Sequence, residues 1–210
     1  MKKLLLASVI TCSMGLSGCI VHVGGHGDDS DIEFGYVRSN QSDLSSVNSY
    51  LRIETHRQVG DVSNVNGNIE LQAFAAAKDI DAVNGNIELT DNNQADNVNS
   101  VNGDIRTNGS HIAHNIESVN GQIKVHNSQV SGDIISLNGD VSLDGSSHIK
   151  GDIVFKSKKR SWWSGNNNHQ PTLKISADSQ IDGRIILQQP VKLDVANPAL
   201  LNKVDYAYKA

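Results

Sequence analysis

The sequence predicts an all-β fold, a single-stranded parallel β-helix solenoid with 18-residue coils and capped ends. The first observation is a Val/Leu-Asn-Gly motif that recurs every 18 residues between 65 and 139, because a fixed repeat is typical of structural units stacked in a row. The second is an alternation of branched apolar and polar residues, as in 67–71, which indicates short strands with one buried face. Glycine and asparagine within every repeat disfavour helix.

Four positions of the repeat are aliphatic in almost every coil, and we expect all four to stack into one continuous core. Their columns begin at Leu44, Val47, Leu51 and Ile53. The second column continues as Val65, Val83, Val101, Val119 and Leu137. Neighbouring coils then lie about 4.8 Å apart, which is the ordinary spacing between hydrogen-bonded strands.

The Asn-Gly step of each repeat falls where the chain turns between two strands. Glycine adopts a positive φ without a steric penalty, so the pattern predicts a positive φ at each turn glycine. The stacked asparagine side chains are expected to form a ladder of amide hydrogen bonds. We interpret this ladder as structural rather than as a binding stripe. Its members are Asn66, Gly67, Asn84, Gly85, Asn102, Gly103, Asn120, Gly121, Asn138 and Gly139.

One polar column of the repeat indicates a solvated face. It comprises Glu70, Glu88, Arg106, Lys124 and Ser142. Stacking places Glu88 beside Arg106, which is favourable, and Glu70 beside Glu88, which is mildly unfavourable. Such surface pairs contribute little to stability, so the column does not indicate a functional site.

Residues 1–18 have the features of a bacterial lipoprotein signal peptide. Lys2 and Lys3 precede a mostly apolar stretch that is too short to span a bilayer. The stretch ends in Leu-Ser-Gly-Cys, which resembles the lipobox, and this resemblance implies cleavage before Cys19 and lipidation of that residue. Because an aspartate at the next position commonly retains such proteins in the inner membrane, Ile20 favours the outer membrane. An ordinary secretory signal is the alternative.

Charge and cysteine content restrict the function classes. The formal charge of −5 becomes −7 when Lys2 and Lys3 are removed with the leader, and an acidic chain argues against nucleic-acid binding. Cys12 lies in the leader and Cys19 is the predicted lipid site, so no thiol remains for a disulfide or a metal. We expect no cofactor.

Residues 19–31 are expected to form a polar, glycine-rich tether. Within it, residues 24–29 match the opening of a calcium-binding repeat, but the match occurs once and lacks its apolar position. A flexible spacer is therefore favoured over a metal site. The side chains that would hold an ion are His22, His26, Asp28 and Asp29.

Residues 32–210 are assigned to the β-helix domain. Ile32, Phe34 and Tyr36 are expected to cap the first coil, since a solenoid end exposes unpaired strand edges. Regular coils are predicted over about 44–153, with no proline before Pro171. Final coils and a closing cap are predicted over 171–210.

An insertion is predicted at 156–170, and it is the strongest candidate for a partner-binding site. It combines cations with two tryptophans on an otherwise acidic chain, and Trp and Arg are enriched where proteins bind partners. The alternative is that both rings pack over a coil. The candidate residues are Lys158, Lys159, Arg160, Trp162 and Trp163.

The repeats, of the form Ser-Val-Asn-Gly-Asn-Ile-Glu-Leu and Ser-Gly-Asp-Ile, resemble the bacterial adhesin-type β-helix repeat families over about 44–187. Their coils are also similar to those of bactofilins, which polymerise. The resemblance implies a parallel β-helix in the cell envelope and carries no catalytic residues. We therefore expect a lipid-anchored, non-enzymatic and monomeric protein that presents a binding surface to an envelope protein or glycan. The alternatives are a self-polymerising scaffold and a polysaccharide-active enzyme.

An enzyme of the last class requires two carboxylates that flank the substrate. Asp104, Asp133 and Asp140 are candidates, although two of them adjoin turn glycines, where aspartate is usually structural. A cluster of His111, His114 and His126 is a further candidate for metal binding. Solvent-exposed turn histidines are the favoured interpretation, and we expect no metal.

Overall fold

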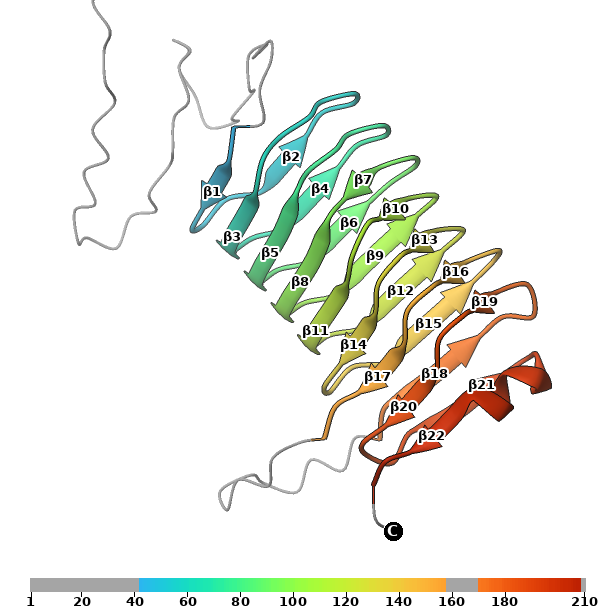
Figure 1. The fold of residues 1–210 in the computed structure, drawn as a ribbon. Coiled ribbons are helices and arrows are strands. Elements are labelled where there is room, and N and C mark those ends of the chain that lie inside the picture. The colour runs from blue at the N-terminus through green and yellow to red at the C-terminus, as the bar shows by residue number, and fades with distance from the viewer. Residues whose placement is uncertain (1–41, 158–169, 209–210) are drawn as a thin grey trace, which may run out of the picture.

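The computed structural model describes residues 42–157 and 170–208. The described chain winds into about eight turns of a parallel β-solenoid, which confirms the predicted fold class. Three short strand segments in each coil align with those of the neighbouring coils to make three sheets (Figure 1).

All three sheets are parallel. The nine-stranded sheet contains β1 (Leu44–Ser46), β3 (Val62–Asn66), β5 (Asp79–Asn84), β8 (Asn97–Asn102), β11 (Ile116–Asn120), β14 (Ile134–Ser136), β17 (Ile153–Phe155), β20 (Ile185–Leu187) and β22 (Val204–Tyr206). The eight-stranded sheet contains β2 (Leu51–Ile53), β4 (Ile69–Leu71), β6 (Ile87–Leu89), β9 (Ile105–Asn108), β12 (Ile123–His126), β15 (Val141–Asp144), β18 (Thr172–Ile175) and β21 (Lys192–Val195). The five-stranded sheet contains β7 (Gln94–Ala95), β10 (His111–Ile112), β13 (Gln129–Val130), β16 (His148–Ile149) and β19 (Gln180–Ile181).

The strand register follows the 18-residue repeat, as in the pairs Leu44↔Val62 and Asn84↔Asn102. The turns leading into the five-stranded sheet absorb small deviations, because Gln94 pairs with His111 and Gln129 pairs with His148. The large deviation falls between β17 and β18. There Val141 pairs with Leu173, 32 residues later, so the coils above and below the insertion still stack.

The core consists of inward-facing aliphatic side chains from all three sheets. Three of the four predicted columns are buried, as shown by the near-zero exposure of Val62, Ile69 and Leu71. The prediction for the column that begins at Val47 was wrong. Val47, Val65, Val83 and Val101 are 39–41% exposed. Val47 lies three residues after the inward-facing Leu44, and side chains alternate between faces along a strand, so the two cannot share a face.

Small polar residues fill most of the inward position next to the valine column. It holds Ser46, Asn64, Ala82, Ser100, Ser118 and Ser136, all at most 8% exposed. The last three serines donate to the carbonyl oxygens of the turn glycines Gly103, Gly121 and Gly139, at 3.1, 3.2 and 2.7 Å. These hydrogen bonds satisfy buried turn carbonyls, which would otherwise be costly to bury.

The C-terminal end is closed by a 3-10 helix, η1 (Pro198–Lys203), and by β22. Asn197 caps the helix by accepting a hydrogen bond from the Ala199 amide, and Leu200 is buried against the core. Lys203 Nζ donates to the carbonyl oxygens of Ile181 and Asp182, at 2.6 and 2.9 Å. Together they cover the last coil, whereas the predicted N-terminal cap residues lie outside the described chain.

Candidate functional site

The asparagines of the repeated motif form the side-chain ladder that the sequence predicts. Each Nδ2 donates to the Oδ1 of the asparagine one coil earlier, from Asn66 to Asn48 through Asn138 to Asn120, over 2.6–2.9 Å. These amides are exposed, but each inner rung is already engaged on both sides. Their arrangement therefore stabilises the stack, and little hydrogen-bonding capacity remains for a ligand.

The reason predicted for the turn glycines was wrong for three of the five. Gly67 and Gly103 have φ of 147° and 158°, whereas Gly85, Gly121 and Gly139 do not have a positive φ. What the five share is close stacking. A Cβ on Gly121 would lie 2.0 Å from the carbonyl oxygen of Gly103, so the turn backbones of successive coils leave no room for any side chain.

Positive φ angles instead occupy the turn that follows the eight-stranded sheet. Six successive coils place a residue there with φ between 46° and 62°. They are His56, Phe74, Asn92, Gly109, Asn127 and Gly145. The last four are the types that tolerate this region, but the first two are bulky. The rings of His56 and Phe74 stack at 4.9 Å between centroids.

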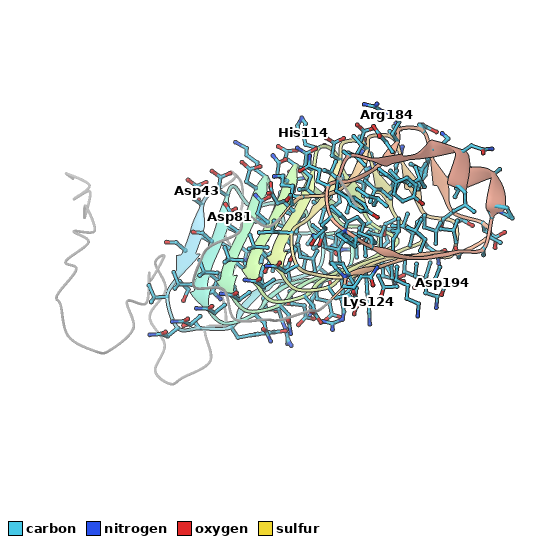
Figure 2. All side chains as sticks on the ribbon, turned by 90° about the horizontal axis from the view of Figure 1, so that it is seen from below. Asp43, Asp81, His114, Lys124, Arg184 and Asp194 are labelled. Atoms are coloured by element: carbon cyan, nitrogen blue, oxygen red, sulfur yellow. The ribbon has the colours of Figure 1, made fainter. Side chains whose placement is uncertain are left out.

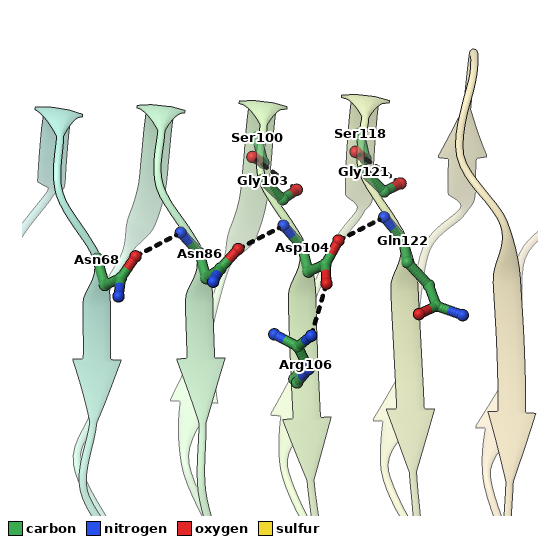
Figure 3. Close-up of polar contacts among 9 residues, drawn as sticks. All are labelled: Asn68, Asn86, Ser100, Gly103, Asp104, Arg106, Ser118, Gly121 and Gln122. Atoms are coloured by element: carbon green, nitrogen blue, oxygen red, sulfur yellow. Dashed lines mark hydrogen bonds and ion pairs between the residues drawn. The ribbon is translucent and has the colours of Figure 1, made fainter.

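A second ladder crosses the start of the eight-stranded sheet and includes the candidate carboxylate Asp104. Asn68, Asn86 and Asp104 each accept, through Oδ1, a hydrogen bond of 2.9 Å from the backbone amide one coil later, ending at Gln122 (Figure 3). The other oxygen of Asp104 contacts Arg106 at 2.5 Å. Both oxygens of this carboxylate are therefore engaged within the solenoid.

The other two candidate carboxylates make the same kind of contact. Asp133 Oδ1 accepts from the Asp152 amide, and Asp140 Oδ1 accepts from the Thr172 amide, each at 2.8 Å. Asp133 itself continues a ladder in which its amide donates to Asn115 Oδ1. The three residues belong to different coils and each joins its coil to the next. They are well placed for structure, and none of these contacts indicates a catalytic pair.

The three candidate histidines are exposed on the variable part of their coils. His126 Nε2 lies 2.9 Å from Asn127 Nδ2, and His114 projects from the outer surface (Figure 2). Within residues 42–157 and 170–208, no three His, Cys, Asp or Glu side chains form a group that could hold a metal ion.

The exposed charged column lies in the predicted register, but its ion pairs differ from the expected ones. Glu88 is in register with Arg106, yet Arg106 turns to Asp104 on its own strand. Glu70 instead pairs with Arg52 at 3.4 Å. Burial, followed by the nearby charge of Glu88, raises the pKa of Glu70. This column is solvated over most of its length and has no arrangement typical of a site.

The base of the insertion is held firmly. Gln189 Nε2 donates to the carbonyl oxygens of Leu137 and Lys156, at 2.6 and 2.9 Å, and so joins coils on both sides of the opening. Lys156 Nζ also pairs with Glu117 Oε1 at 2.7 Å. The predicted binding residues 158–163 lie outside the described residues, so that assignment stays a prediction. The same holds for Cys19 and for the tether.

The feature missed by the sequence interpretation is the exposed valine column. Its signal was available, because strand parity places Val47 and Leu44 on opposite faces. A continuous row of aliphatic side chains on the outside of a sheet is unusual, and such rows mark interaction surfaces when they form a patch.

Comparisons with known proteins add no identity. No protein family, curated protein or solved structure matches the chain. In the part of the chain that the structure describes, no helix has the length and apolar character needed to cross a bilayer. The resemblance of the repeats to adhesin-type and bactofilin β-helices therefore stays a prediction.

Proposed function

We propose that this protein is a lipid-anchored, non-enzymatic component of the bacterial cell envelope that presents a rigid binding surface to an envelope protein or glycan. The observation that carries the proposal is the use of polar side chains. The asparagine and aspartate ladders bind successive coils together. Such side chains are the usual material of an active site, and here they are spent on maintaining a stiff, regular support.

The proposed anchor is lipid on Cys19, followed by the tether 19–31, which places the solenoid near the outer membrane. The proposed contact point is the insertion, with Lys158, Lys159, Arg160, Trp162 and Trp163. Its base supports this role, because Gln189 and the Lys156–Glu117 pair fix the point from which the segment departs. A binding segment on a stiff support loses less entropy on association than one whose base must also become ordered.

Deletion of the insertion tests the proposal. Residues 158–167 are replaced by a Gly-Ser bridge, and the lipidated protein is used to recover partners from envelope extracts. We expect the coils to remain folded, because Val141 and Leu173 pair across the insertion, and we expect the partner to be lost.

A matched control separates the insertion from general loss of positive charge. Lys158, Lys159 and Arg160 are changed to serine in one variant, and the exposed Lys124, Lys150 and Lys174 are changed to serine in the other. We expect only the first variant to lose the partner. Equal recovery by the wild type and the deletion variant would move the binding site to the strand faces.

A further inference from the structure

The repeated Val-Asn-Gly motif is only partly explained by the architecture. The asparagine forms the amide ladder, and the glycine is required because a Cβ would collide with the turn one coil earlier. The valine has no equivalent reason, since it faces outward and is about 40% exposed in four coils. Threonine has the same branched shape and a similar strand preference, yet it occurs in none of these coils.

The neighbouring outward column shows that the valines were not simply retained from duplication. That column has diverged to five residue types in six coils, namely Ser45, Ser63, Asp81, Asn99, Glu117 and Ile135. Over the same coils the valine column changes only once, to Leu137. We call the six residues Val47, Val65, Val83, Val101, Val119 and Leu137 the valine ridge. At about 4.8 Å per coil the ridge is roughly 24 Å long.

Acidic side chains run parallel to the ridge on the same sheet. Asp43, Asp61 and Asp79 share the column at the start of the strands, and Asp81 lies between that column and the ridge. Figure 2 shows Asp43 and Asp81 on the outside of the first coils. None of the four forms an ion pair with another described residue. The cation nearest in sequence is Lys78, so these five residues carry a net charge of −3 (four carboxylates and one ammonium).

From these two rows we propose that this face binds a basic amphipathic helix of another protein, which lies along the solenoid axis. Four residues separate the acidic column from the ridge, or about 13 Å at 3.3 Å per residue. A helix with its side chains is about 10–12 Å across, so its apolar stripe meets the ridge while its cations meet the aspartates. Its pitch of about 5.4 Å stays close to the coil spacing over three or four turns.

Charge decides between this occupant and a second copy of the chain. A second copy brings the same acidic rows to the interface, and like charges in contact oppose association. A basic helix supplies the opposite charge and an apolar stripe together, which is the usual composition of helices that bind open apolar surfaces. The inference rests on the proposed function, in that it names the partner class for a binding surface of this solenoid.

The test uses a synthetic peptide of about 14 residues, roughly 21 Å long as a helix, with leucine and lysine at amphipathic spacing. Its binding to the delipidated protein is followed by fluorescence anisotropy. The ridge variant carries Val65→Thr, Val83→Thr and Val101→Thr, which keeps the branched shape. We expect it to bind at least about tenfold more weakly, because the apolar contact is lost. The acidic variant carries Asp61→Asn, Asp79→Asn and Asp81→Asn, and we expect a flatter salt dependence.

Three controls make the result decisive. A peptide of the same composition with scrambled order is expected to bind weakly, and Glu88→Gln, on the eight-stranded sheet, is expected to bind normally. Unchanged affinity in the ridge variant, or equal affinity for both peptides, overturns the inference. So does a wild-type dimer in sedimentation that the ridge variant abolishes, because the ridge then binds a second copy. Partner recovery that depends on the insertion would survive each of these failures, so the proposed function is tested separately.

Discussion

The change Gly121→Ala tests whether close stacking, rather than a positive φ, requires glycine at the Asn-Gly turn. The new Cβ would lie 2.0 Å from the Gly103 carbonyl oxygen, whereas ordinary carbon–oxygen contacts begin near 3.3 Å. The turn must therefore move by about 1.3 Å. That shift strains a packed region, at about 1–3 kcal/mol. It also weakens the Gly103–Asn120 backbone hydrogen bond of 3.2 Å, worth about 1 kcal/mol. We expect a total loss of about 2–4 kcal/mol.

Urea unfolding followed by circular dichroism measures this loss, and Gly109 supplies the control. Gly109 has φ of 58°, but a Cβ there would meet its nearest atom at 3.6 Å. Because Asn92 and Asn127 occupy the same position in neighbouring coils, Gly109→Asn is expected to change stability by less than about 1 kcal/mol. If Gly121→Ala cost no more than Gly109→Asn, steric exclusion would not be the reason for the repeated glycine.

Three further predictions concern the anchor, the acidic column and assembly. Cys19→Ala is expected to leave an unprocessed precursor, which immunoblotting after membrane fractionation detects; normal processing would exclude lipidation at this residue. The raised pKa of Glu70 means that its ionised form is disfavoured in the folded state, so stability falls as pH rises from the unfolded pKa through the folded one. Glu70→Gln should therefore raise the urea midpoint at pH 7, and this gain should disappear as pH falls below the unfolded pKa; a gain that persists in acid would contradict this cause. Electron micrographs of the delipidated protein should show no long filaments, because η1 and β22 cover the C-terminal coil.

The coil architecture was predictable because the repeat carries the information twice, in its spacing and in its alternation. Leu44, Leu51 and Ile53 head columns that are buried as expected, since each column repeats one face of one strand. The Val47 column was assigned to the wrong side because aliphatic character alone was counted, and the odd separation from Leu44 was not. The inward serines beside it were not anticipated, because their burial depends on turn carbonyls that only the folded coil brings close.

The turn chemistry was less accessible from the sequence. An Asn-Gly pair indicates a turn, but the contact between Gly121 and Gly103 arises between coils and has no signal within either repeat. The true positive-φ column was obscured because its members differ, with Phe74 and Asn92 in equivalent positions. Likewise, the choice of Arg106 between Glu88 and Asp104 depends on side-chain geometry within about 3 Å, which register alone does not determine.

The way the solenoid accommodates its insertion has a practical consequence. The 32-residue step from Val141 to Leu173 preserves the strand pairing on both sides, and Gln189 closes the base by bonding to two coils. A foreign peptide placed between Ser157 and Gln170 would thus leave through a fixed opening without shifting the phase of later coils. The protein is in this sense a ready-made carrier for grafted epitopes, in which the cargo and the stability of its support are independent variables.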